Sequence, residues 1–355
     1  MTDATIRSKD MDPQDQSINQ PIVSIVLPIF NRERFLKEAF ESILAQSFRS
    51  WELIVVDDGS EDNPRVAVDA LGESCPGRVH YIYQSNGGPG AARDRGIDCV
   101  RGRYVAFFDS DDLWLPHHLA DCVAELDAHS ELDWVFGADQ IRELNTGKTI
   151  RENTFYQDGR PCRFTRLRNR TCGRLHIITD KKLLPTVLLG DPMGVLQASV
   201  IRTDVFREVR IPHFRLGEDA AFLIGFLAFG GRLGYIDDVH VIYRIHNSHT
   251  SNAGPDVDID KRIDGEIEYI KAFNSQFNCK GLDCVGKRAL SRRIARECFW
   301  SLGYALYWQH NRRIEALAAF RRGIGTWLWY PSMWKTYAVC MLKHGILSFY
   351  EKVCQ

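Results

Sequence analysis

The sequence predicts an α/β protein with a mostly parallel, doubly wound sheet, and three observations support this fold class. Short β-branched runs alternate with helical patterns over residues 22–137, which is the order that crossover connections between parallel strands produce. Polar clusters follow three of these runs, and ligand sites of open α/β sheets lie outside the carboxyl ends of the strands. The last part of the 355 residues shows helical patterns alone. We therefore expect a helical C-terminal extension behind the sheet domain.

The elements of the first part follow from their hydrophobic periodicity and from the turn residues between them. Strands are expected at residues 22–27, 51–56, 79–83, 104–108 and 132–137. Helices are expected at residues 34–46, 65–71 and 117–128, and from the glycine loop 86–90 through Ile97. Together these elements would form one open sheet with helices on both faces.

The later elements are less regular. Strands are expected at 196–201 and 239–245, a buried helix at 220–229, a polar linker at 252–260, and helices at 262–273, 288–307 and 314–322. Segment 151–174 is loop-like and carries seven arginines. We favour a solvated loop there, the alternative being a segment that closes on a diphosphate or an anionic acceptor, because guanidinium groups suit phosphate.

Charge is balanced overall but unevenly distributed along the chain. The 45 Lys and Arg nearly match the 46 Asp and Glu, yet residues 287–343 hold eleven basic and two acidic residues together with five of the eight tryptophans. This balance excludes a disordered or uniformly basic protein, and no nucleic acid partner is expected. The basic, Trp-rich tail either packs on the sheet domain or lies on an anionic membrane surface.

The ends of the chain and its cysteines bear on location. Residues 1–20 are polar, are expected to be disordered, and lack the layout of a signal peptide. No apolar run is long enough to span a bilayer. We expect a cytoplasmic protein, peripheral to the membrane if the tail binds lipid. The ten cysteines are irregularly spaced without a CxxC pair, so reduced thiols are expected and a zinc site is not favoured.

The acidic cluster Asp109-Ser110-Asp111-Asp112 is the strongest chemical signal. It follows an apolar strand, and neighbouring carboxylates repel one another unless a cation joins them. Hard oxygen ligands suit Mg²⁺ or Mn²⁺ held together with substrate phosphates. The alternative is an acidic turn that caps the next helix.

Three further motifs are ambiguous when taken singly. Asp57-Asp58-Gly59-Ser60 follows a strand and either contacts a nucleoside or forms a turn. The segment 86–93 (NGGPGAAR) has glycines before a helix that suit an anion, yet it is neither GxGxxG nor a Walker A loop. Glu218 and Asp219 at a helix start either complement the helix dipole or supply a general base.

In their order along the chain these motifs resemble the family 2 glycosyltransferases with a GT-A fold. The resemblance covers about residues 21–250 and rests on PIFNRERFL (28–36), WELIVVDDGS (51–60), NGGPGAAR (86–93), YVAFFDSDD (104–112) and GED (217–219). It implies an inverting, metal-dependent enzyme that uses a nucleotide sugar. It places the nucleotide-binding half at about 21–140 and the acceptor half at about 141–250, and leaves 261–355 as the helical C-terminal region.

The resemblance also implies a role for each matching residue. The nucleotide would contact Pro28, Phe30, Asn31, Asp58, Arg93 and Asp109, with Asp58 on the base, which we expect to be uracil, and Asp109 near the ribose. The metal, Mn²⁺ or Mg²⁺, would be bound by Asp111, and His246 in the segment YRIH would contact the metal or a phosphate. Asp112 and Asn86 would support the donor sugar. Asp219, with Glu218 beside it, matches the catalytic base.

The expected reaction moves a sugar from a nucleotide-diphosphate sugar, a UDP-sugar by preference, to a hydroxyl of a glycan or lipid-linked acceptor in cell-surface polysaccharide synthesis. One alternative is a sugar-nucleotide nucleotidyltransferase, which would release pyrophosphate. Such an enzyme would carry a glycine-rich, lysine-bearing loop where this chain has Pro28-Ile29-Phe30-Asn31. The other is a non-catalytic sugar-nucleotide-binding scaffold, disfavoured because Asp58, Asp111 and Asp219 are all present.

Overall fold

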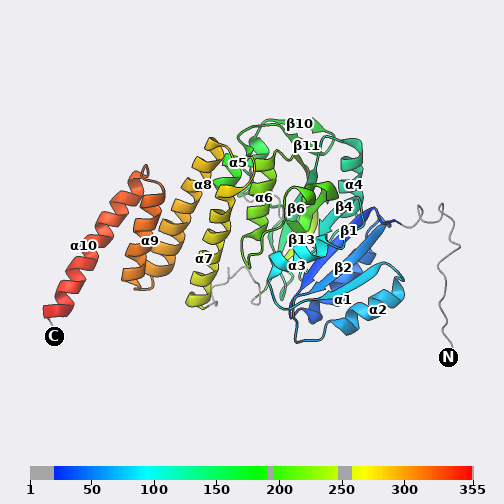
Figure 1. Cartoon of the computed structure of the whole chain (residues 1–355), viewed down its shortest axis with the longest axis horizontal. Helices are drawn as coiled ribbons and strands as arrows, with labels where there is room; N and C mark the ends of the chain where they lie inside the picture. Colours follow the sequence, from blue (N-terminus) through cyan, green and yellow to red (C-terminus); the bar gives the residue numbers. More distant parts are fainter. Residues whose placement is uncertain (1–19, 191–195, 247–257, 354–355) are drawn as a thin grey trace, which may run out of the picture.

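The computed structural model describes residues 20–190, 196–246 and 258–353. In this region an α/β body is followed by a row of helices that leads away from it (Figure 1). The expected disordered segment at the N-terminus and most of the expected linker 252–260 lie outside the described residues.

One large mixed sheet forms the centre of the body. Its order is β10 (Asn169–Cys172), β11 (Leu175–Ile178), β13 (Leu233–Ile245), β6 (Trp134–Glu143), β12 (Ser199–Arg202), β4 (Tyr104–Phe107), β1 (Val23–Ile29), β2 (Trp51–Asp57) and β3 (Val79–Tyr83). Strands β11 and β12 run against the others. Two short strands join the side of this path, β5 (Leu113–Trp114) on β13 and β7 (Thr149–Arg151) on β6. The expected mostly parallel sheet is confirmed.

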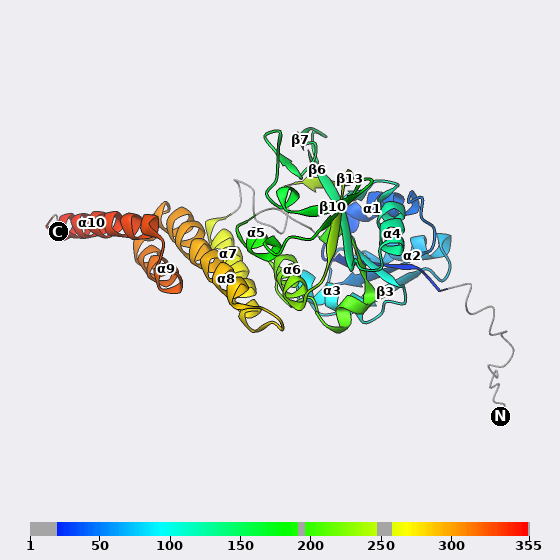
Figure 2. The same ribbon diagram turned by 90° about the horizontal axis from the view of Figure 1, so that it is seen from above.

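Helices cover both faces of the sheet, as the alternation within β1 requires. Ile25 and Leu27 join a core with α1 (Glu33–Leu44), α2 (Arg65–Ser74) and α4 (His118–Ala128), whereas Val26 joins the opposite core. Helices α3 (Pro89–Ile97) and α6 (Glu218–Phe229) pack on that opposite face (Figure 2). Successive strand side chains point to opposite faces, so a strand with apolar side chains on both faces needs helices on both.

The arginine-rich segment is more ordered than the sequence suggested. It contains the end of β7, a hairpin of β8 (Tyr156–Gln157) and β9 (Arg160–Pro161), a 3₁₀ turn at Phe164–Arg166, and β10. Phe155 and Phe164 are buried and pack edge-on against each other beside Phe136. Two aromatic anchors in a polar segment are the reason that an extended loop folds onto the sheet here.

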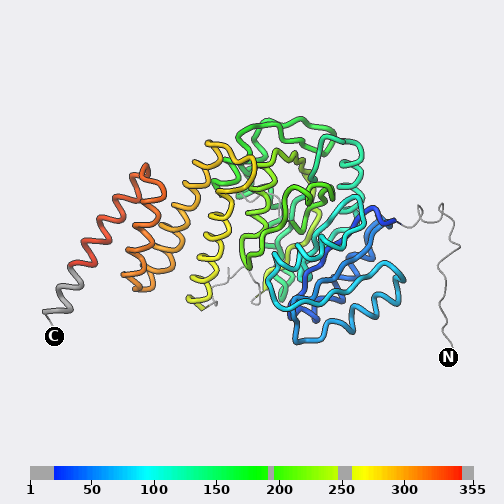
Figure 3. The backbone as a smooth tube through the Cα atoms, viewed as in Figure 1, coloured from blue at the N-terminus to red at the C-terminus, as the bar shows by residue number. Residues whose placement is uncertain are grey.

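The C-terminal helices follow one another away from α6 in the order α7 (Ile259–Ser275), α8 (Cys284–Arg296), a π-helix (Glu297–Trp308), α9 (Arg313–Thr326) and α10 (Pro331–Val353) (Figure 3). The expected helix 288–307 is therefore α8 continuing into the π-helix. Residues 261–355 were expected to be helical without a separate helix assigned to 331–353, and α10 begins at Pro331, which is compatible with the first turn of a helix. Helix α5 (Leu183–Leu188), which precedes α6 in the chain, packs on α8.

The tryptophans of this region divide into two groups. Trp300, Trp308 and Trp327 pack against a third hydrophobic core that holds the C-terminal helices together. Trp329 is 85% exposed and Trp334 is 47% exposed. Within the described residues no helix combines the length and apolarity that crossing a bilayer requires.

Candidate active site

A cavity of about 1080 Å³ opens at the carboxyl ends of β1, β2 and β4, opposite the N-terminus of α6. Ten of the twelve site residues expected from the sequence line it: Pro28, Phe30, Asn31, Asp58, Asn86, Arg93, Asp109, Asp111, Glu218 and Asp219. The other two, Asp112 and His246, are buried beside Asp111, behind the lining. Residues nearly 200 positions apart are thus brought together at one edge of the sheet.

Asp58 fixes the glycine loop. Its carboxylate accepts hydrogen bonds from the backbone N–H of Gly87 (2.8 Å) and of Gly88 (2.7 Å) and from Gln84 Nε2 (2.7 Å). Gly88 has φ +89°, and a Cβ there would lie 3.0 Å from Arg215 Cγ. The position therefore requires glycine for both backbone conformation and space. Both oxygens of Asp58 are engaged with the loop that starts α3.

The turn after β1 is held by Asn31. Its backbone is left-handed, with φ 53°, and its side-chain oxygen accepts a hydrogen bond from the Glu61 N–H at 2.8 Å. The neighbouring Phe30 is 44% exposed and lines the cavity. An aromatic face in a cavity mouth is a suitable platform for a planar ring.

Arg93 joins the two sides of the cavity. Its Nη2 lies 2.7 Å from Asp109 Oδ1, at the end of β4, and its Nη1 lies 2.5 Å from Glu218 Oε1, at the start of α6. Burial opposes the charge of this guanidinium, but the attraction of Asp109 and Glu218 outweighs burial and raises the pKa of Arg93. The arginine is therefore a permanent cation within the site.

The acidic loop after β4 is rich in carboxylates. Asp111 Oδ2 lies 3.1 Å from His246 Nε2 and 3.8 Å from Arg32 Nε. Asp112 is fully buried and accepts a hydrogen bond from the Arg244 N–H at 3.0 Å, while its Oδ2 has no partner among the described residues. Burial, and then the charges of Asp111 and Asp109, hold the pKa of Asp112 well above its usual range. This excess of carboxylate oxygen suits a hard divalent cation at Asp111.

Asp219 and Glu218 occupy the first turn of α6. Asp219 Oδ1 accepts a hydrogen bond from the adjacent Ala220 N–H at 2.6 Å. Burial raises the pKa of Asp219, and the Asp109 charge adds to that effect, although the Ala220 N–H and Arg93 act against it. Burial also raises the pKa of Glu218, to about 7. A carboxylate with a raised pKa is a stronger base than one in water, which suits proton removal.

The cavity also holds residues that the sequence analysis did not single out. They are Asp139 in β6 and Arg262, Glu266 and Tyr269 in α7, whereas Arg151 at the end of β7, which also lines the cavity, belongs to the arginine-rich segment singled out from the sequence. Burial, followed by the Asp109 charge, raises the pKa of Asp139 to about 8. A lone Asp within the apolar run WVFGAD was a usable signal for Asp139. The α7 residues gave none, because they lie beyond the last recognised motif.

Comparison with known proteins identifies several glycosyltransferases that are similar to this chain in sequence. GlyG, a glycosyltransferase of Streptococcus pneumoniae, is 28% identical over 270 residues, which cover 74% of this chain and 81% of GlyG. A putative teichuronic acid biosynthesis glycosyltransferase, TuaG of Bacillus subtilis, is 38% identical over 27% of this chain and 38% of its own. An uncharacterized glycosyltransferase of Nostoc is 40% identical over 97 residues. These residues cover 27% of this chain and only 30% of that relative's length.

Two solved structures share the fold. TarS of S. aureus, residues 1–349 with UDP-GlcNAc, matches with a TM-score of 0.60 and 19% identity over 86% of this chain and 81% of its own. The mannosyltransferase PcManGT of Pyrobaculum calidifontis, with GDP-Man and Mn²⁺, matches with a TM-score of 0.53 and 16% identity over 94% of this chain and 82% of its own. At these identities the likeness concerns the fold.

The family model described as glycosyl transferase family 2 matches residues 24–208, which is more than half of the chain. That range contains the turn after β1, Asp58, the glycine loop with Arg93, and the acidic loop that together line the cavity. The chain therefore belongs to glycosyl transferase family 2 and has the GT-A fold.

Proposed function

We propose that this chain transfers a sugar, with inversion, from a nucleotide-diphosphate sugar to a hydroxyl of a glycan or lipid-linked acceptor. One observation carries the proposal: the acidic loop of β4 and the carboxylate of Asp219 line the same cavity from opposite sides. A donor held at one side and a base at the other are what a single displacement at the anomeric carbon requires.

The donor would lie along the carboxyl ends of β1, β2 and β4. Phe30, Asn31 and Asp58 would surround the base and Asp109 the ribose, while Arg93 keeps Asp109 in place. TarS is described with UDP-GlcNAc and PcManGT with GDP-Man, and we propose a UDP-sugar here. The unpartnered oxygen of Asp112 beside Asp111 supports a divalent cation. When bound, Mn²⁺ or Mg²⁺ would offset the charge of the leaving diphosphate.

Asp219 would remove the proton of the acceptor hydroxyl. It lines the cavity, its pKa is raised by burial, and Arg93 and Glu218 fix the end of α6 on which it stands. The acceptor oxygen then attacks from the face opposite the nucleotide. A nucleotidyltransferase would instead use the cavity to release pyrophosphate, so product analysis separates the two activities.

The acceptor side would be completed by α7 and the π-helix. Glu266, Tyr269 and Ser301 line the cavity, so we extend the acceptor-binding part beyond residue 250 into the C-terminal region. Burial, followed by the Glu297 charge, raises the pKa of Glu266 to about 8. Its Oε1 has no partner among the described residues. A neutral carboxyl group in the wall suits a hydrogen bond to an acceptor hydroxyl.

The process served by the reaction is proposed from a relative and from the tail. TuaG is named for teichuronic acid biosynthesis, and we propose synthesis of a cell-surface polysaccharide on the cytoplasmic side of the membrane. Leu328, Trp329 and Trp334 form an exposed patch, in which the Trp334 indole N–H donates to the Leu328 carbonyl at 2.9 Å. Because residues 287–343 are rich in Arg and Lys, we propose an anionic membrane surface as the partner of this exposed aromatic patch.

The Asp219→Asn variant tests the base. Transfer should fall by about 10²–10⁴-fold, because the amide cannot accept the proton, while UDP affinity stays unchanged. Transfer is measured by product formation and affinity by calorimetry. Asp204→Asn, an exposed surface pair with Arg207, is the matched control and should behave as wild type.

The pH dependence sharpens this test. Because the pKa of Asp219 is raised, wild-type kcat/KM should fall with decreasing pH already above the usual carboxyl range near 4. Protonation removes the base, so activity is present above the raised pKa and lost below it. Near-normal turnover in Asp219→Asn, or a rate that stays flat down to the usual range, would contradict the assignment.

The Asp111→Asn variant tests the metal. Wild type should bind UDP more tightly with Mn²⁺ than without, and the variant should lose that difference because a carboxylate ligand is gone. Calorimetry with UDP, and with GDP in parallel, measures the effect and the nucleotide preference. Asp69→Asn, in an exposed pair with Arg65, serves as the control. Equal Mn²⁺ enhancement in wild type and Asp111→Asn would refute the role of Asp111.

Substitutions of Glu266 test the acceptor wall. Glu266→Ala should raise the acceptor KM by about 2- to 12-fold, equivalent to one lost hydrogen bond, and leave UDP affinity unchanged. Glu266→Gln should restore the KM, because a neutral amide also donates. Glu268→Ala, on the same helix and outside the cavity lining, is the control. An unchanged acceptor KM in Glu266→Ala would exclude Glu266 from acceptor binding.

The membrane proposal is tested by co-sedimentation with vesicles. The full chain should sediment with phosphatidylserine-containing vesicles and less with neutral ones, and Trp329→Ser should reduce sedimentation, because an exposed indole and basic charge act together. Val66→Ser, at another exposed apolar position (66% exposure) in α2, is the control. Equal partitioning of wild type and Trp329→Ser would remove the patch from membrane contact.

A further inference from the structure

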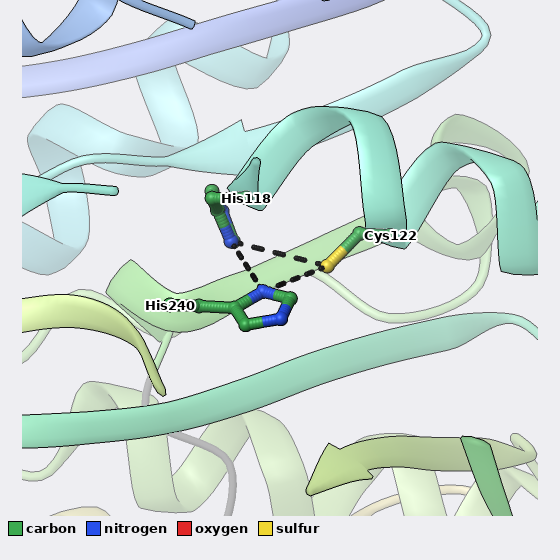
Figure 4. Close-up of side chains that lie close together, drawn as sticks. All are labelled: His118, Cys122 and His240. Atoms are coloured by element: carbon green, nitrogen blue, oxygen red, sulfur yellow. Dashed lines mark hydrogen bonds between the residues drawn. The ribbon is translucent and has the colours of Figure 1, made fainter. Parts of the chain in front are cut away.

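Three buried side chains converge outside the cavity, between α4 and β13 (Figure 4). The Nδ1 atoms of His118 and His240 lie 3.2 Å apart. The sulfur of Cys122 lies 3.9 Å from His118 Nδ1 and 3.7 Å from His240 Nδ1. All three residues have no solvent exposure. None of them is required by the glycosyl transfer proposed above.

The spacing of these atoms matches one face of a coordination tetrahedron. Zinc binds imidazole nitrogen at about 2.0–2.1 Å and thiolate sulfur at about 2.3 Å, which places neighbouring donor atoms about 3.3–3.6 Å apart. The three distances in the cluster scatter around these values within a few tenths of an ångström. Two imidazoles and a thiolate are also the donor set that zinc prefers over magnesium or calcium.

The fold seats His240 in a specific way. Along the pairing of β13 with β6, Val239 opposes Ala138 and Val241 opposes Asp139, so His240 is an extra residue in a β-bulge. Bulges re-aim a side chain within a sheet. Position 137 is glycine, and a Cβ there would lie 2.3 Å from the Cγ of the His240 ring. The bulge and the missing side chain together make the space that the imidazole occupies.

Helix α4 presents the other two donors in register. His118 and Cys122 are four residues apart and therefore lie on one face of the helix. His117, the residue before α4, and Asp121 form a second group with His240, whose ligand atoms lie within 4.8 Å of one another.

Hydrogen bonding alone leaves the cluster poorly satisfied. Two neutral imidazoles that face each other through Nδ1 share a single proton, so only one of the two Nδ1 lone pairs accepts a hydrogen bond. An ion at the Nδ1 atoms would use both lone pairs, which a histidine–histidine hydrogen bond cannot do.

We propose that His118, Cys122 and His240 bind a structural zinc ion. The ion would tie α4 to β13 close to the active site. The acidic loop continues through β5 into α4, and β13 continues from His240 to Arg244 and His246, which contact Asp112 and Asp111. The clamp would therefore fix the two segments that meet at the proposed donor-metal position, and it is independent of the proposed transfer reaction.

Elemental analysis of the purified full chain tests the proposal. Wild type, after exhaustive dialysis against magnesium buffer, should retain stoichiometric zinc, and Cys122→Ser should lose it. Cys298→Ser, a change at another fully buried cysteine, is the matched control and should retain zinc. Asp111→Asn should also retain zinc, because that variant alters only the proposed donor site. This arm separates the buried site from adventitious binding at the acidic loop.

X-ray absorption on wild-type protein provides a test that needs no variant. The zinc spectrum should show one sulfur at about 2.3 Å together with imidazole scattering.

A third measurement removes the metal with a chelator. Chelation should lower the melting temperature of wild type and not that of Cys122→Ser. A chain without zinc, copper in its place, or a zinc spectrum without sulfur would overturn the proposal.

Discussion

The buried guanidinium of Arg93 is the contact on which the site depends. It lies between Asp109 at the end of β4 and Glu218 at the start of α6, at 2.7 and 2.5 Å. These carboxylates belong to the opposite walls of the cavity. Without the cation they would repel each other across it, and removing one partner of a buried ion pair typically costs about 3–5 kcal/mol. Arg93 therefore sets the distance between the proposed donor and base sides.

The position of Arg93 follows from the glycine loop in front of it. Asp58 accepts hydrogen bonds from two N–H groups of that loop, and the loop begins α3 with Pro89 in the first turn. Arg93 then lies one turn into α3. The carboxylate that we propose contacts the nucleotide thus also orients the helix that carries Arg93.

Much of the sheet and most of the expected site residues were predictable from the sequence. Strands such as β2 are apolar on both faces and end in polar clusters, a pattern that is local in the chain. Asp58 and Asp109 could be placed at one edge because parallel strands share that edge. Asp219 was predicted as a site residue only because the GED motif resembles that of family 2 glycosyltransferases. No local sequence pattern shows that α6 lies opposite β4.

What escaped prediction depends on long-range pairing. Glu266 faces the cavity because α7 packs on α6, and a helical period cannot show against which surface a helix packs. His240 meets Cys122 through a bulge in β13 and a glycine in β6, and neither residue is near the other in sequence. Irregular spacing argued against a cysteine–histidine site, yet such spacing arises when two elements far apart in the sequence, α4 and β13, converge in space.

The uneven charge of the chain acquires a structural meaning from this arrangement. Acidic residues gather where β4 and α6 face each other, and Arg93 is the buried cation that holds them there. The basic residues of the tail are distributed differently: Arg312 pairs with Asp260 and Glu315, and Arg293 pairs with Glu297. Part of the basic tail therefore fastens the helices to one another. Helix α7 belongs to both the helical core and the cavity wall. The packing of the C-terminal helices therefore also determines the shape of the proposed acceptor side.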